Sequence, residues 1–222
     1  SNVFAPHTDM SRTVLLNGMT PIYFLEYLRN CAPQTKFFQA SSAEMFALVS
    51  GAKNEESVML PRSPYGHAKL FAHRMVQEYR DHGGVYAVSG IFFNHESPRR
   101  GDQFVTRKIV NALARIACDD KEVLEVGNLD AKRDWGYAPE YMELVYTLMQ
   151  QERADAYVIA TGVLRSVRDV VECACEYFGM QVVWRGKGLE EVGLINGVQR
   201  IRVSPDFYRA ADTLQIYGDI TK

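Results

Sequence analysis

The chain has 222 residues, of which 47% are hydrophobic and 23% are charged, so it can bury a substantial core in one or two domains. Its formal net charge of −2 gives no field that would attract nucleic acid or an anionic membrane. No apolar run approaches the ~20 residues that a membrane-spanning helix needs. The four cysteines, Cys31, Cys118, Cys173 and Cys175, form no C-x-x-C pair and predict buried, reduced thiols in a cytoplasmic protein.

Helical and strand patterns alternate along the chain, which predicts an α/β fold with a mostly parallel sheet covered on both faces. Apolar residues spaced three or four apart indicate helices, and short runs of β-branched and aromatic residues indicate strands. In chain order the expected elements are a helix over 12–30, a strand over 36–40, a helix over 65–82, a strand over 85–93, a helix over 103–118, a strand over 123–126, a helix over 139–151, a strand over 156–160, a helix over 166–178 and a strand over 182–184.

One feature that usually accompanies this architecture is absent from the sequence. Neither G-x-G-x-x-G nor G-x-x-G-x-x-G occurs, although a dinucleotide-binding domain carries such a turn after its first strand. Residues 1–7 resemble a loop that leaves a strand, and residues 218–222 stop where a further helix is expected. We therefore expect a partial doubly wound sheet.

The spacing of Tyr65 and Lys69 indicates redox chemistry on an alcohol or sugar. On a helix that follows Pro64, these two residues lie one turn apart on the same face. An ammonium group beside a phenol favours the phenolate, so the tyrosine can act as a base below its usual pKa of about 10. The competing interpretation is a surface helix with a solvated lysine. The neighbouring Ser63-Pro64, and the strand that ends near Ser41 and Ser42, favour catalysis.

A carboxylate follows the strand that precedes this helix. In Ser42-Ala43-Glu44, one interpretation is that Ser42 caps a helix and that the dipole of this helix stabilises the Glu44 carboxylate. This structural role does not exclude a catalytic one. The carboxyl end of a strand is where ligands bind in open α/β sheets. We therefore count Ser42 and Glu44 with Tyr65 and Lys69 as candidate catalytic residues.

Basic residues cluster in the loop after the strand over 85–93. The run 94–101 reads Asn-His-Glu-Ser-Pro-Arg-Arg-Gly, and Arg107 and Lys108 follow it. Arginine suits phosphate because its donors can bind in a bidentate manner, but a solvated basic loop remains the alternative. Arg133, beside Asp134, and Arg209 are less decisive. No histidine, cysteine or carboxylate spacing matches a metal site.

Six runs together resemble the GDP-mannose 4,6-dehydratase family of extended short-chain dehydrogenase/reductases. They are 41–45, 61–65, 93–101, 104–109, 133–136 and 158–162, with 94–109 the most specific. The resemblance covers essentially the whole chain. It implies an NADP-binding Rossmann domain interleaved with a smaller carboxyl-terminal sugar-nucleotide domain. It also implies that the family's amino-terminal portion, with the glycine-rich turn, is missing.

The resemblance also implies roles for individual residues. Tyr65 would take the C4 hydroxyl proton of GDP-mannose, Lys69 would hold the nicotinamide ribose and lower the pKa of Tyr65, and Glu44 would remove the C5 proton. The product would be GDP-4-keto-6-deoxymannose. The implied cofactor contacts are Lys69, His95 and Arg100, and the implied sugar-nucleotide contacts are Asn94, Lys108, Arg133 and Arg209.

The chain departs from the family pattern at three positions in or next to these motifs. Ser42 stands where threonine is usual but keeps the hydroxyl, and Ala43 replaces a small polar residue. Ala210 stands where proline usually follows the arginine, which loosens the assignment of Arg209.

We expect residues 1–94 to form the remainder of the Rossmann domain and 95–222 mainly the sugar-nucleotide part, with 137–162 returning to the Rossmann sheet. Family precedent also implies a dimer or tetramer. The alternatives are another nucleotide-sugar dehydratase or epimerase, and a non-catalytic remnant that acts as a binding or oligomerising module.

Overall fold

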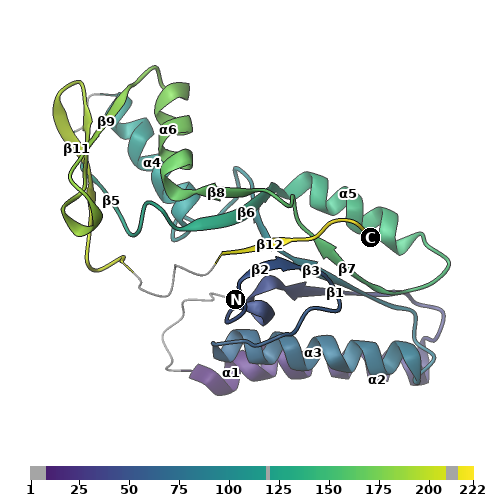
Figure 1. Ribbon diagram of the computed structural model, residues 1–222. Helices are drawn as coiled ribbons and strands as arrows, with labels where there is room; N and C mark the ends of the chain where they lie inside the picture. Colours follow the sequence, from purple (N-terminus) through teal and green to yellow (C-terminus); the bar gives the residue numbers. More distant parts are fainter. Residues whose placement is uncertain (1–8, 119–120, 209–214) are drawn as a thin grey trace. The chain divides into compact units, whose positions relative to one another are not determined.

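The computed structural model describes residues 9–118, 121–208 and 215–222 (Figure 1). They form two compact units: unit 1 comes from 1–95, 134–163 and 216–222, and unit 2 from 96–133 and 164–215. The chain leaves unit 1 within β4 (Asn94–Glu96), returns at β6 (Lys132–Tyr137) and leaves again before β8 (Leu164–Ser166).

The core of unit 1 is a parallel sheet with the strand order β1-β3-β7. These strands are β1 (Phe37–Ser42), β3 (Ala87–Phe92) and β7 (Ala156–Ile159), and every residue of the central strand β3 is buried. A strand buried on both faces has a nearly continuous apolar run, which residues 85–93 supply with Ser89 as the polar exception. A second parallel pair joins β2 (Gly51–Lys53) to β12 (Ile216–Gly218).

Helices cover both faces of the unit 1 sheet (Figure 1). One face carries α3 (Pro64–Asp81), packed against α2 (Thr20–Cys31), and the other carries α5 (Ala138–Met149). Because side chains alternate along a strand, neighbouring residues serve different faces. Phe92 packs with Tyr141 of α5, whereas Ile91 packs in a cluster that includes Leu70 of α3.

The first helical run contains a π turn that the sequence did not predict. Leu15–Met19 forms this turn between α1 (Met10–Val14) and α2. Gly18 lies within it and is buried against α3, where an added Cβ would meet the Phe71 ring at 3.4 Å and the Ala68 carbonyl oxygen at 3.6 Å. These distances correspond to ordinary van der Waals contact, so they show that the π turn packs against α3 without requiring a glycine at this position.

Unit 2 contains a four-stranded sheet with the order β5-β11-β10-β9. Its strands are β5 (Leu124–Val126), β9 (Val182–Arg185), β10 (Val192–Ile195) and β11 (Val198–Val203), with a 3-10 turn over Gly188–Glu190. Helices α4 (Val105–Ala117) and α6 (Val167–Tyr177) pack against each other (Figure 1). A capping box joins Ser166 and Asp169 at the start of α6, and Gly179 follows its end with a φ of 69°.

The predicted α/β fold is confirmed, and each of the ten predicted elements lies within two residues of its observed bounds. The prediction missed the short strands β2, β4, β6, β8, β10, β11 and β12. The prediction of buried thiols is wrong for Cys31, Cys118 and Cys173, which are exposed at helix ends or on an outer helix face, and correct for Cys175. Among the described residues, no helix has both the length and the apolar character that crossing a membrane requires.

Candidate active site

The first part of the candidate site lies where β1 ends in unit 1. Ser42 is the last residue of β1, and its Oγ accepts a hydrogen bond from the backbone N–H of Glu44 at 3.2 Å. This bond caps the 3-10 turn Ala43–Phe46. The cap holds the half-buried Glu44 just beyond the carboxyl end of the strand, where open α/β sheets bind ligands.

The second part lies on the first turns of α3. Ser63 caps this helix by accepting a hydrogen bond from the Gly66 N–H at 3.0 Å, and Pro64 occupies its first position. Tyr65 and Lys69 therefore lie one turn apart, as predicted. The Lys69 Nζ is 5.6 Å from the centroid of the Tyr65 ring.

Backbone contacts bring these two parts together. An added Cβ at Gly66 would lie 2.9 Å from the backbone carbonyl oxygen of Glu44, so the start of α3 touches the 3-10 turn directly. Lys69 donates a hydrogen bond from Nζ to the carbonyl oxygen of Ala40 in β1 at 3.0 Å. Unit 1 thus places Ser42, Glu44, Tyr65 and Lys69 on two adjoining segments.

The lysine in this group has altered acidity. Burial lowers the pKa of Lys69 below its ordinary value, because desolvation disfavours the ammonium form. Its bond to the Ala40 carbonyl fixes the ammonium beside the phenol. A cation held in this position can stabilise a tyrosinate and donate to a hydroxyl group.

Asn94 and His95 follow the central strand β3, next to β1 in the sheet. The His95 Nδ1 lies 2.9 Å from the carbonyl oxygen of Phe93, and because a carbonyl only accepts, Nδ1 carries the proton and donates it. The His95 ring packs against Phe92 and Tyr141, at centroid distances of 5.2 and 5.8 Å. These contacts fix the ring.

Unit 2 holds Arg100 in place with neighbouring side chains. Its guanidinium carbon lies 3.6 Å from the centroid of the Phe104 ring, and its Nε is 3.2 Å from a carboxylate oxygen of Glu96. Glu96 also accepts a hydrogen bond from the Thr106 hydroxyl. The arginine is therefore preorganised, which suits a residue that binds phosphate.

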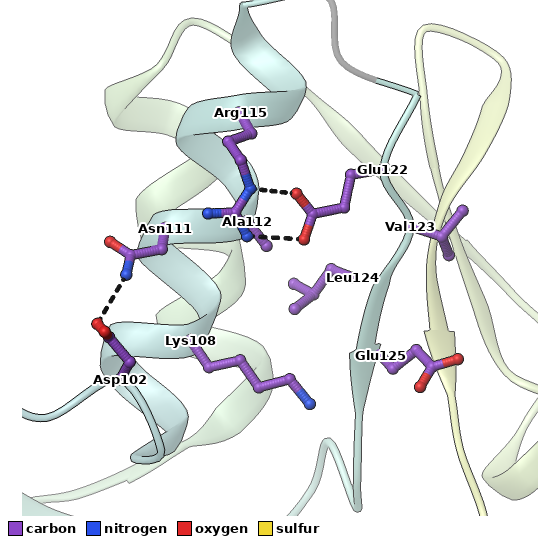
Figure 2. Close-up of a pocket in the computed structure, with 9 residues that line it drawn as sticks. All are labelled: Asp102, Lys108, Asn111, Ala112, Arg115, Glu122, Val123, Leu124 and Glu125. Carbon is purple, nitrogen blue, oxygen red and sulfur yellow. Dashed lines mark hydrogen bonds and ion pairs between the residues drawn. The ribbon is translucent and has the colours of Figure 1, made fainter.

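A pocket of about 440 Å³ lies in unit 2 between α4 and β5, and Figure 2 shows the Lys108 side chain extending into it. The Lys108 Nζ stacks on the Phe207 ring at 3.3 Å from the centroid. Burial lowers the pKa of Lys108, and the nearby Glu125 partly opposes this effect. The ion pair between Arg115 and Glu122 forms part of the pocket wall (Figure 2).

The two remaining predicted contacts are less constrained. Arg133 is half-buried at β6, and its Nη1 donates to the carbonyl oxygen of Lys132 at 2.8 Å. Arg209 lies outside the described residues. Within the described part of the chain, no group of three histidine, cysteine or carboxylate side chains could hold a metal ion.

Sequence reasoning missed two buried polar groups near these segments. The His73 Nδ1 on α3 lies 3.0 Å from the Ser41 Oγ on β1. Asp134 is buried and accepts four hydrogen bonds, from the N–H and hydroxyl of Thr161 and from the N–H groups of Gly162 and Gly218. The spacing of His73, four residues after Lys69 on the same helix, could have revealed the first group.

A family model described as GDP-mannose 4,6 dehydratase matches residues 3–222. The chain belongs to the GDP-mannose 4,6-dehydratase family. Several relatives carry that name, among them proteins from three different organisms. The one from Drosophila melanogaster is 40% identical over 220 residues, covering 96% of this chain and 56% of the relative. The one from Sinorhizobium fredii is 46% identical over 192 residues, covering 85% and 55%. The human relative is 40% identical over 215 residues, covering 95% and 58%.

Solved structures agree with this membership at the level of the fold. RMD from Pseudomonas aeruginosa, solved with NADPH, superposes with a TM-score of 0.78 at 21% identity, covering 96% of this chain and 66% of that one. The dTDP-glucose 4,6-dehydratase from Bacillus anthracis, solved with NAD, gives a TM-score of 0.72 at 17% identity, covering 92% and 58%. Unit 1 is therefore a Rossmann-type sheet. The chain spans a little over half the length of the family relatives that it matches.

Proposed function

We propose that this chain carries the catalytic residues of an NADP-dependent GDP-mannose 4,6-dehydratase, a hydro-lyase that forms GDP-4-keto-6-deoxymannose. The observation that carries the proposal is the arrangement in unit 1. Lys69 is held beside Tyr65 at 5.6 Å from its ring, and the backbone of Glu44 packs against the same helix turn. The relatives named for this activity are 40–46% identical to this chain over 192–220 residues.

Tyr65 and Lys69 act first in the proposed reaction. Tyr65 takes the proton of the C4 hydroxyl group, and the adjacent ammonium of Lys69 stabilises the phenolate that makes this possible. Ser42 donates a hydrogen bond to the C4 oxygen. Lys69, His95 and Arg100 would hold NADP⁺, which would supply a hydride acceptor for C4 and, once reduced, a hydride donor for C6.

Glu44 then acts on the 4-keto sugar. The ketone acidifies the C5 proton, Glu44 removes it, and the same proton goes to the departing C6 hydroxyl group, which leaves as water. C5 then receives one proton, which balances the proton that Tyr65 took from the C4 hydroxyl group. The sugar loses one water with no net redox change.

The residues present suit NADP and a sugar nucleotide. Lys69 can donate to ribose hydroxyls, the fixed ring of His95 presents Nε2, and Arg100 offers a preorganised cation for phosphate. We assign these three residues to the cofactor. For the GDP-sugar we propose Asn94, Lys108, Arg133 and Arg209. The partly buried ammonium of Lys108 in its pocket supports this proposal.

The direct test is incubation of the protein with GDP-mannose and NADP⁺, followed by mass spectrometry. We expect a sugar nucleotide that has lost one water and reacts as a ketone. Glu44→Gln should retain NADP⁺ binding and abolish the loss of water. The exposed Glu56→Gln serves as the matched control and should behave as wild type. Recovery of unchanged GDP-mannose from the wild-type protein would contradict the proposal.

The alternatives predict different results in the same assay. Another nucleotide-sugar dehydratase would dehydrate dTDP-glucose or UDP-glucose in preference to GDP-mannose, and an epimerase would change the sugar without loss of mass. Glu44 favours dehydration, because a simple C4 epimerisation needs no base at C5. A non-catalytic module would turn over none of these compounds, and calorimetric titration with NADP⁺ would then show whether it binds the cofactor.

We further propose that the protein self-associates through the apolar face of α2. Tyr23, Phe24 and Tyr27 lie on this helix with more than half of each side chain exposed. Contiguous exposed aromatic residues mark interaction surfaces. The neighbouring Glu26 accepts a hydrogen bond from Tyr79 and forms an ion pair with Arg29, so its negative charge is balanced by a cation on the same helix. A cytoplasmic location stays a prediction.

A further inference from the structure

The hydrogen bond between Ser41 and His73 lies on the face of the unit 1 sheet that α3 covers. Ser41 pairs in register with Ile91, and residues paired in this way point to the same side of a sheet. Ile91 packs in the cluster that includes Leu70 of α3. Ser41 therefore faces α3, whereas its neighbour Ser42 follows on the alternate side and ends the strand.

This pair is shielded from water. Ser41 is 3% exposed and His73 is 4% exposed, and 3.0 Å separates Oγ from Nδ1. Burial lowers the pKa of His73 to about 4, with smaller contributions from Arg74 and Arg80, so the imidazole is neutral at physiological pH. A neutral imidazole has one donor and one acceptor nitrogen, and no solvent molecule can replace either partner at this depth.

Three contacts from one side of α3 reach the same short segment of chain. Gly66 touches the carbonyl oxygen of Glu44, Lys69 donates to the carbonyl oxygen of Ala40, and His73 bonds Ser41. The contacts of Gly66 and Lys69 are with backbone carbonyl groups, and Lys69 already has a proposed role beside Tyr65. The His73 bond joins two side chains that have no other proposed role, so its function can be to position the helix.

His73 stands eight residues after Tyr65, about 12 Å further along the helix at 1.5 Å per residue. It lies too far along the helix to contact the reacting atoms, so any effect on the reaction must act through the placement of α3. Apolar packing alone permits small sliding and rotation, whereas a buried hydrogen bond has a preferred length and direction.

We propose that His73 is a positioning residue whose hydrogen bond to Ser41 fixes the rotation and height of α3 on β1. This bond sets the height of Tyr65 and Lys69 relative to the carboxyl end of β1, where Ser42 and Glu44 lie. The inference rests on the proposed function for its catalytic meaning, but its geometric content concerns α3 and β1 alone. A displacement near 1 Å at a reacting group can cost on the order of a hundredfold in rate.

Four substitutions distinguish the hydrogen bond of His73 from the volume of its side chain. His73→Phe keeps an aromatic ring and removes the hydrogen bond. His73→Asn places a polar group near the position of Nδ1 and should restore the bond, whereas His73→Gln reaches toward the position of Nε2 and should not. Ser41→Ala removes the same bond from the strand side.

The first readout needs no turnover. ¹³Cζ NMR of labelled tyrosine and ¹³Cε NMR of labelled lysine report the titration of Tyr65 and Lys69 in the chain. We expect His73→Phe, His73→Gln and Ser41→Ala to shift one or both midpoints by at least half a pH unit. His73→Asn should return them toward wild type. Thermal melts run in parallel show which variants are folded.

The second readout is the steady-state rate with GDP-mannose and NADP⁺. His73→Phe should lower kcat by about tenfold or more and leave KM within about twofold, because the substrate contacts are intact. His73→Asn should recover most of kcat. Failure of the proposed function would remove this readout but leave the NMR titrations as the test.

A purely structural role gives a different outcome. His73→Phe or Ser41→Ala would then lower the melting temperature while the Tyr65 and Lys69 titrations stayed at their wild-type midpoints. That result would overturn the inference. Identical behaviour of His73→Asn and His73→Gln, with both as perturbed as His73→Phe, would also overturn it.

Discussion

At the scale of single residues, Asp134 shows how a buried charge can hold distant parts of the chain. In the sequence it stands beside Arg133. In the structure, its two oxygens accept four hydrogen bonds from the residues Thr161, Gly162 and Gly218. A buried carboxylate is tolerated when hydrogen bonds satisfy its oxygens. Asp134 therefore joins β6 to the segment after β7 and to β12, all within unit 1.

Replacement of Asp134 by asparagine should destabilise the protein. The substitution removes the negative charge and turns an amide NH₂ toward backbone donors, so at least one N–H loses its partner. We expect a loss of about 3 kcal/mol in the free energy of unfolding. Urea denaturation measures it. Glu140→Gln, exposed on α5, should change stability by less than about 0.5 kcal/mol. Equal stability of the two variants would contradict the role of Asp134.

His73 should make stability depend on pH. The pKa of His73 is lowered to about 4 in the folded chain, whereas an unfolded histidine has a pKa of about 6.5. Between these values the unfolded state binds the extra proton, so stability is complete above about pH 6.5 and falls as the pH decreases toward 4. The maximum loss is about 3 kcal/mol, at 1.36 kcal/mol per pKa unit.

Urea denaturation at several pH values tests this dependence. His73→Phe lacks the titrating group, so its stability should decline less steeply between pH 6.5 and 4.5 than that of the wild type. Parallel curves for the two proteins would show that His73 titrates normally in the folded state.

At the scale of secondary-structure elements, the long helices were the easiest to predict and the short strands the hardest. Helices such as α3 and α4 repeat their apolar spacing over several turns, and that redundancy fixes their bounds. Strands of three residues, such as β2 and β12, carry no such repetition. These short strands form because each pairs with a segment that is distant in the sequence.

Of two structural features that the prediction missed, one has a recognisable signal in the sequence and the other has none. Asn196-Gly197 separates the β-branched runs of β10 and β11, and both residues have positive φ, 52° and 77°. This pair favours the tight turn of a hairpin and could have revealed both strands. The π turn at Leu15–Met19 has no comparable signal in the sequence, and it packs against α3, which is distant along the chain.

The capping box of α6 provides a test at this scale. The Ser166 Oγ accepts a hydrogen bond from the Asp169 N–H at 3.0 Å, and the Asp169 carboxylate accepts one from the Ser166 N–H at 2.8 Å. Ser166→Ala should cost about 1 kcal/mol of stability. Ser166→Asp restores a capping oxygen and should recover part of the loss. Hydrogen exchange at the first turn of α6 should accelerate in the alanine variant, and unchanged exchange would count against the cap.

At the scale of the whole molecule, the predicted site residues occur in both units, and each unit holds its own group of them. Ser42, Glu44, Tyr65, Lys69, Asn94 and His95 lie in unit 1, and Arg100, Lys108 and Arg133 lie in unit 2. Local spacing predicted the pair on α3, since one helix turn determines it. It could not predict His73 with Ser41, or Lys108 with Phe207, because these contacts depend on how separate segments pack. Resemblance to a family supplied the assignments in unit 2.

The apolar face of α2 gives the last prediction at this scale. A helix face that presents Tyr23, Phe24 and Tyr27 to water is costly for a monomer, and burial against a second copy removes that cost. Because large aromatic residues dominate binding energy at interfaces, the double substitution Phe24→Glu and Tyr27→Lys should weaken self-association by at least about tenfold. Sedimentation equilibrium over a range of concentrations measures this change. Tyr146→Lys alters an exposed aromatic residue on α5 and should leave association unchanged. A wild-type chain that stays monomeric at high concentration, or a double variant that associates as tightly as wild type, would exclude α2 as the interface.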